Sequence, residues 1–235
     1  MSNPFPRRRG KITRGLQLLR LENLEDRRLL AAISWNTDSN GFWDVATNWS
    51  PQQVPGSGDQ VTIDRGAANP AITVRDFRFV GSFTSRESLV VDPLGTLRIE
   101  AASQIEASTL VVQGTLQPLA QVTVMATGQI DWQSGNIFGN GTKIAAGGTL
   151  GLSGSADKRL AGLITNHGLI VHAGDGDLLL DGSSIVANNP GAVYDFAGDG
   201  DIGPSGGGAG FASYFQNDGT MRKSAGTGAT SEVSL

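Results

Sequence analysis

The chain has 235 residues, of which 33 are glycine and none is cysteine, so a disulfide framework and a thiolate zinc site are excluded. High glycine with few lysines, glutamates and aromatic residues favours many tight turns between short strands over helices. Residues 1–30 carry eight basic and three acidic side chains and therefore a charge of +5. Because the net charge of the chain is −4, the remaining residues carry −9, and such an acidic body is not expected to bind nucleic acid.

The first 32 residues are expected to be a basic leader, helical or disordered. From Arg14 to Leu30, leucines are interspersed with charges at roughly helical spacing, which predicts a short amphipathic helix. The longest apolar run, Leu29 to Ile33, is too short for a membrane span or an ordinary signal-peptide core, so we expect no transmembrane segment. A surface helix or a solvated basic arm is the alternative. A twin-arginine signal at residues 7–9 would need a hydrophobic region directly after it, which this sequence lacks.

The last twelve residues of the leader have a distinctive order of leucine, acidic and basic residues. It reads Leu21-Glu22-Asn23-Leu24-Glu25-Asp26-Arg27-Arg28-Leu29-Leu30-Ala31-Ala32. This resembles the N-terminal Leu-Glu-x-Arg-x-Leu-Leu sorting motif of large planctomycete-type bacterial surface proteins, with Asp26 where that family usually has proline. The resemblance implies that export machinery recognises residues 1–32 and that the protein is extracellular or lies at the cell surface.

Residues 33–88 are expected to form a β cap and the first coils of a repeat. Tryptophans set between glycine and proline turns favour aromatic closure of the end of a sheet. The segment resembles a module of autotransporter-like and planctomycete surface proteins that precedes a β-helix. The matching residues are Trp35, Trp43, Asn48, Trp49, Pro55, Asp59, Val61 and Ile63.

A short phrase, glycine then a small or polar residue and an aliphatic one, recurs along the rest of the chain. It begins at Gly95, Gly114, Gly128, Gly148, Gly168, Gly191 and Gly219. The gaps of 19, 14, 20, 20, 23 and 28 residues indicate a drifting period near twenty, as in coils with tolerant turns.

Aliphatic runs between these glycines suit strands with one face turned into a narrow core. They include Leu89-Val90-Val91, Leu110-Val111-Val112, Val122-Thr123-Val124 and Leu178-Leu179-Leu180. We therefore predict an all-β fold, a parallel β-helix (solenoid), with repeats over residues 89–235. A sandwich of antiparallel strands is the structural alternative. The pattern stops mid-repeat at Leu235, so a longer architecture is expected.

Two asparagine phrases, at residues 165–168 and 215–221, place asparagine before a turn glycine and predict ladders from coil to coil. Residues 215–228 also resemble the β-helix repeats of large bacterial adhesins and autotransporter passengers. The glycine-rich run at residues 204–208 is expected to be a loop inserted between coils.

Six aspartates are the candidates for catalysis or calcium binding. They are Asp175, Asp177, Asp181, Asp195, Asp199 and Asp201. Carboxylates clustered on one face of a β-helix would suit polysaccharide lyases or hydrolases, and close Asp-Gly-Asp pairs can offer hard oxygen ligands to calcium. The Gly-Asp-Gly-Asp settings at residues 174–177 and 198–201 are more typical of turns, in which aspartate caps its own backbone, and neither pair matches a complete calcium repeat.

The histidines and tryptophans offer weaker candidates. His167 and His172 are five residues apart, which places them on opposite faces of a continuous strand and argues against a shared metal, so we expect surface or turn positions. A Ser-His-Asp triad stays open, although no Gly-x-Ser-x-Gly elbow supports it. Burial in the capping core is the commoner fate of residues such as Trp43 and Trp49 and is what we expect, whereas stacking on sugar rings, if they were exposed, is the alternative.

The expected function is therefore a secreted or cell-surface structural or adhesive β-helix protein without catalytic activity, cofactor or metal. Extracellular polysaccharide or other surface proteins are the expected partners. The alternatives are a carbohydrate-active β-helix enzyme and a calcium-binding or small-ligand module.

Overall fold

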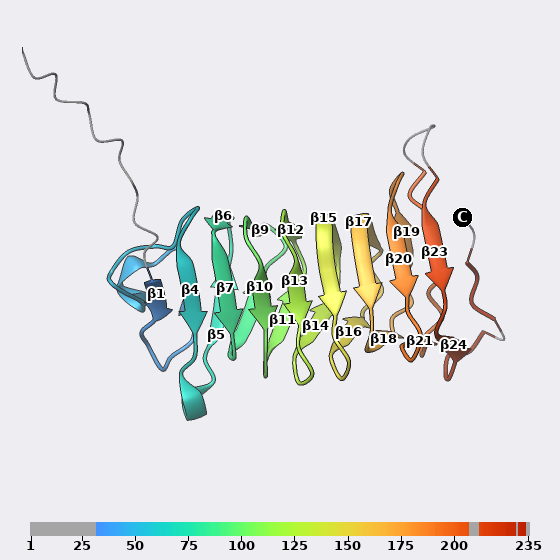
Figure 1. Ribbon diagram of the computed structural model, residues 1–235, viewed down its shortest axis with the longest axis horizontal. Coiled ribbons are helices and arrows are strands. Elements are labelled where there is room, and N and C mark those ends of the chain that lie inside the picture. The colour runs from blue at the N-terminus through green and yellow to red at the C-terminus, as the bar shows by residue number, and fades with distance from the viewer. Residues whose placement is uncertain (1–31, 207–211, 229, 234–235) are drawn as a thin grey trace, which may run out of the picture.

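The computed structural model describes residues 32–206, 212–228 and 230–233 and is an all-β parallel solenoid of about 7 turns (Figure 1). The predicted fold class is confirmed, and the antiparallel sandwich is wrong because strands of successive coils pair in parallel. The predicted leader lies outside the described residues except for Ala32, with which β1 begins.

Strands at equivalent positions of successive coils stack into three faces. Face 1 contains β1 (Ala32–Trp35), β4 (Gln60–Ile63), β7 (Ser82–Ser85), β10 (Ser103–Ile105), β13 (Val122–Val124), the C-terminal parts of β15 (Gly135–Ile144) and β17 (Lys158–Asn166), β20 (Ile185–Asn188) and β23 (Tyr214–Asn217). Face 2 contains β2 (Gly41–Phe42), β5 (Ala71–Val74), β8 (Ser88–Val91), β11 (Thr109–Val112), β14 (Gln129–Trp132), β16 (Thr149–Leu152), β18 (Leu169–His172), β21 (Val193–Phe196) and β24 (Thr220–Lys223). Face 3 contains β6 (Phe77–Val80), β9 (Thr96–Ile99), β12 (Thr115–Pro118), the N-terminal parts of β15 and β17, β19 (Leu178–Leu180) and β22 (Ile202–Pro204).

The core is a set of inward rows that run along the solenoid. On face 2, one row contains Leu89, Leu110, Ile130, Leu150 and Ile170, each about 1% exposed or less. Alternate residues of each strand point inward, so a coil buries its apolar side chains against the coils on either side. The aliphatic runs predicted as strands are confirmed as β8, β11, β13 and β19. The predicted boundary between residues 88 and 89 falls inside β8, within this continuous stack.

The glycine phrase marks two different corners of the coil. Gly95 and Gly114 precede β9 and β12 on face 3, whereas Gly128 and the later glycines precede strands of face 2. The gap of 14 residues is therefore a step from one corner to another and not a shortened coil.

Three tryptophans close the N-terminal end of the core. Trp35, Trp43 and Trp49 are 1% exposed or less, and the Trp49 ring lies 4.9 Å from Trp35 and 4.8 Å from Trp43 between centroids. A 3₁₀ turn, η1 (Ala46–Asn48), returns the chain so that β3 (Trp49–Ser50) pairs antiparallel with β1, on the edge opposite β4. This strand covers an edge that would otherwise offer free backbone groups.

An asparagine ladder runs through the last coils of face 1. The Asn166 amide donates to Asn188 Oδ1 at 2.8 Å, and the Asn188 amide donates to Asn217 Oδ1 at 2.6 Å. The same amides also donate to the carbonyls of Val193 and Thr220, both at 3.0 Å. The predicted ladder is confirmed, with Asn188 as its central member.

Candidate binding surface

The two Gly-Asp-Gly-Asp turns stack directly on one another, and their aspartates form a ladder. The Asp177 backbone N–H donates to the Asp157 carboxylate at 3.0 Å, and the Asp201 N–H donates to Asp177 Oδ1 at 2.9 Å. The Glu232 N–H continues the series to Asp201 Oδ1 at 2.7 Å. A methyl group added at Gly176 would overlap the Ala156 carbonyl oxygen, so glycine permits this close stacking. These carboxylates bind the backbone of the next coil.

The other candidate aspartates take separate partners. Asp181 pairs with Arg159 at 2.7 Å and Asp195 with Arg222 at 2.8 Å. Burial alone would raise the pKa of Asp195, but its hydrogen bonds to Arg222 and Ser224 bring it below the ordinary value. Asp199 has a lowered pKa because the Thr227 side chain, the Gly228 and Thr227 backbone and Lys223 donate to it. Asp175 is exposed. Within the described residues, no group of three or more His, Asp or Glu side chains is placed to hold a metal.

His172 lies in the core, so its expected surface or turn position is wrong. Its row on face 2 contains Trp132, Leu152 and Phe196, which makes position 172 inward-facing. Nε2 lies 2.9 Å from the Gly176 carbonyl and Nδ1 lies 3.2 Å from Tyr194 Oη. Burial lowers the pKa of His172. His167 is exposed in the turn after β17, so the two imidazoles do not converge on one site.

Acid should weaken the fold through His172. Because its folded pKa lies below the ordinary 6.5, the unfolded chain takes up a proton first as the pH falls. This contribution is complete above about pH 6.5 and is lost as the pH falls toward the folded-state pKa. Urea unfolding between about pH 7 and pH 5 should show a loss of roughly 1 kcal/mol.

Two variants isolate that contribution. His172→Gln should lose this part of the pH dependence, whereas His167→Gln should retain it because His167 is exposed. Equal pH slopes in the two variants would show that His172 is not the responsible group.

Lys158 is a second polar residue of the interior that the sequence did not identify. It is fully buried and its ammonium donates to the carbonyls of Ala156 and Gly154 at 2.7 and 3.3 Å. Burial lowers its pKa, opposed by nearby aspartates. Trp43 and Trp49 are buried as well, so their expected place in the capping core is confirmed, and the alternative in which they stack on sugar rings is wrong.

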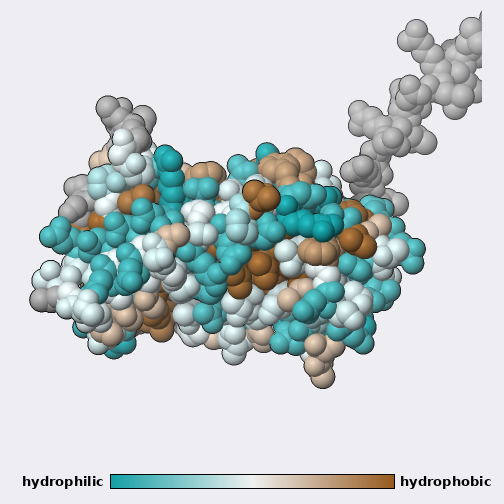
Figure 2. All heavy atoms as spheres, turned by 180° about the vertical axis from the view of Figure 1, so that it is seen from behind, coloured by the Kyte–Doolittle hydropathy of each residue, from teal (hydrophilic) through white to brown (hydrophobic). Residues whose placement is uncertain are grey.

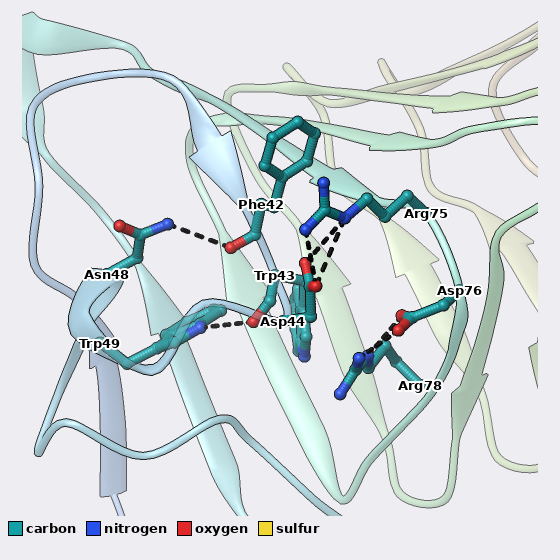
Figure 3. A network of polar contacts seen from close by, with 8 residues as sticks. All are labelled: Phe42, Trp43, Asp44, Asn48, Trp49, Arg75, Asp76 and Arg78. Atoms are coloured by element: carbon teal, nitrogen blue, oxygen red, sulfur yellow. Dashed lines mark hydrogen bonds and ion pairs between the residues drawn. The ribbon is translucent and has the colours of Figure 1, made fainter.

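Exposed aromatic residues gather instead near the N-terminal end, over face 2 and face 3. The side chains of Phe42, Phe77 and Phe79 are 42%, 51% and 38% exposed. The guanidinium of Arg75 lies 3.8 Å from the Phe42 ring centroid and also binds Asp44, which lowers the pKa of that carboxyl (Figure 3). Arg98 lies 5.6 Å from the Phe79 centroid.

Strand β6 presents its side chains in an order opposite to the one that hydrophobicity suggests. Phe77 and Phe79 point outward, while Arg78 and Val80 align with the buried Leu97 and Ile99 of β9. Arg78 at this inward position forms a two-pronged ion pair with Asp76 (Figure 3). The ion pair neutralises a charge at the end of the core row.

A flat surface without charge covers the first full coils of face 2. We call it the threonine–valine surface, and it comprises the outward side chains Ala71, Thr73, Ser88, Val90, Thr109 and Val111. All are half-buried, and neighbouring coils repeat at about 4.8 Å. Seen from behind, the molecule presents hydrophilic and apolar groups side by side along an elongated block (Figure 2).

Two shallow depressions meet at the corner between face 1 and face 2. One is lined by Thr62, Ile63, Asp64, Thr84 and Arg86, and the other by Asp64, Gly66, Asn69, Arg86, Glu87 and Ala107. Arg86 bridges Asp64 at 2.9 Å and Glu106 at 2.6 Å, and Glu87 accepts a hydrogen bond from the Arg65 backbone. The carboxylates here are therefore held by basic or backbone groups.

Over the part of the chain that the structure describes, no helix is long and apolar enough to cross a membrane. Comparison of the chain with protein-family models, with curated proteins and with solved structures gave no match.

Proposed function

We propose that this chain is a secreted or cell-surface β-helix protein with a structural or adhesive role and without catalytic activity. The observation that carries the proposal is the threonine–valine surface, in which small uncharged side chains repeat from coil to coil. Such a surface suits a flat, repeating partner, and extracellular polysaccharide or another surface protein would provide one. The motif at residues 21–32 supports export.

Fractionation of the host tests the location directly. We expect the protein in the medium or envelope, with residues 1–32 removed, as measured by intact mass. Full-length protein confined to the cytoplasm would contradict both export and surface adhesion.

Retention in the envelope fraction tests the role of the surface. Val90→Glu with Val111→Glu places two charges on it, and we expect about tenfold less retention. Gln104→Glu with Thr123→Glu adds the same charge on two adjacent coils of the outward side of face 1 and is the matched control. Equal retention of both double variants would rule out the threonine–valine surface as the contact.

A carbohydrate-active enzyme is the second candidate, and the depressions at the face 1–face 2 corner favour it, because Asp64 and Glu87 line them. Paired carboxylates are the groups that glycoside hydrolysis requires. Release of reducing ends from host polysaccharide, lost in Asp64→Asn and Glu87→Gln, would establish that function in place of the structural one.

A further inference from the structure

Face 3 begins one coil later than the other two faces. Face 1 starts with β1, edged by β3, and face 2 starts with β2, but the chain after β2 turns into η1 and β3 without contributing to face 3. The first strand of face 3 is therefore β6, and β6 pairs with β9 alone among the described strands. Its other edge, which faces the N-terminal end of the solenoid, carries no described strand.

The hydrogen bonds to β9 show which backbone groups of β6 point to that edge. The Thr96 N–H donates to the Asp76 carbonyl at 2.9 Å, and the Glu100 N–H donates to the Val80 carbonyl at 3.0 Å. Backbone groups of successive strand residues point to opposite sides, so positions 76, 78 and 80 face β9. The N–H and C=O groups of Phe77 and Phe79 therefore point to the open edge.

The side chains beside these groups are exposed aromatic rings. The Phe77 and Phe79 rings lie 4.7 Å apart between centroids in an edge-to-face arrangement. Natural edge strands are usually protected by charge, proline or cover, whereas this one presents two phenylalanines on its outer side. A strand added to the edge would place its alternate side chains against these rings.

The charges near the edge select what can be added. Three arginines lie closest to β6, and each has an acidic partner. Arg78 is paired with Asp76, Arg75 with Asp44, and Arg98 with Glu100 at 3.8 Å. An added segment therefore meets neutralised charges and aromatic rings. This favours uncharged β-branched side chains, such as valine and threonine, in its central positions.

We propose that the open edge of β6 binds an extended, uncharged segment of a partner protein by β-strand addition, through the backbone groups of Phe77 and Phe79. The main chain provides affinity and the two phenylalanine rings select apolar side chains at alternate positions. The inference does not depend on where the protein is located.

The test measures binding of full-length protein to a defined peptide, acetyl-Lys-Thr-Val-Thr-Val-Thr-Lys-amide, by fluorescence anisotropy. Two isomers carry N-methyl groups on alternate amides, one on the first set and one on the second. A strand bound at an edge directs one set to β6, so we expect one isomer to bind about tenfold more weakly and the other within about twofold of the parent.

Protein variants locate the contact. Phe79→Pro removes the N–H that faces the edge and leaves the carbonyl acceptors of Asp76 and Val80, so we expect about a tenfold loss of affinity. Phe79→Val retains that N–H and should lose less, about threefold. Far-UV circular dichroism checks that both variants fold, and the N-methylated pair decides the question on the native protein if they do not. Binding that ignores the methylation pattern, or no binding of the parent at about 1 mM, would overturn the proposal.

Discussion

Replacing Asn188 by alanine should lower the free energy of unfolding by about 3 kcal/mol. Its side chain is 1% exposed and takes part in three hydrogen bonds, to Asn166, Asn217 and the Thr220 carbonyl. Alanine removes all three and leaves a small cavity between coils. Urea unfolding followed by circular dichroism measures the loss.

Two further variants control for this result. Asn217 is exposed at the end of the same ladder, so Asn217→Ala should lower the free energy of unfolding by about 1 kcal/mol or less. Asn188→Asp keeps the shape but directs a carboxylate toward Asn217 Oδ1 and the Thr220 carbonyl, both of them acceptors. We expect it to destabilise at least as much as alanine. Equal effects of alanine at positions 188 and 217 would show that the ladder contributes little.

Removal of the Trp49 ring should lower the free energy of unfolding by about 4 kcal/mol and should also promote self-association. This ring packs between Trp35 and Trp43, and its Nε1–H donates to the Trp43 carbonyl at 2.8 Å. Trp49→Ala therefore opens the end of the core and loosens β3 from the edge of β1. Urea unfolding measures the first effect and sedimentation velocity measures the second.

Trp49→Phe separates packing from the hydrogen bond. Phenylalanine retains an aromatic ring but lacks the Nε1–H donor, so we expect a loss of about 1.5 kcal/mol and a monomeric protein. An alanine variant as stable and as monomeric as the phenylalanine variant would mean that the cap is dispensable.

The solenoid could be predicted from the sequence because its signal is local and repeated. Each strand alternates inward and outward residues, and a turn glycine follows at a similar interval. The same alternation applies to His172, which lies two residues after the buried Ile170 and therefore on the same side of strand β18. The alternation therefore predicts an inward position for His172, and the prediction of a surface or turn position is wrong.

The exposed phenylalanines of β6 are a case in which hydrophobicity predicts the wrong side of a strand. By hydrophobicity alone, Phe77 and Phe79 belong inside and Arg78 outside, yet the register with β9 reverses them. The reversal is tolerated because the inward Arg78 forms an ion pair with Asp76, the residue directly before β6. Which side of a strand faces the core is decided here by stacking against the next coil, and composition does not reveal it.

The sequence predicts only part of the aspartate ladder. The Gly-Asp-Gly-Asp pattern predicts turns, but it does not show that the second aspartate of each turn, Asp177 and Asp201, binds the backbone one coil further on. The positions 157, 177 and 201 differ by 20 and 24 residues, close to one coil, and that spacing was the available signal.

Corner length and strand register are independent in this molecule. Seven residues, including the η2 turn (Gly66–Ala68), separate β4 from β5, whereas two separate β7 from β8. Both pairs nevertheless stack in continuous register, β4 on β7 and β5 on β8. The corner between face 1 and face 2 can therefore acquire residues by insertion without disturbing the ladders on either side, which makes it the place where such a chain can gain new surface chemistry while its scaffold is conserved.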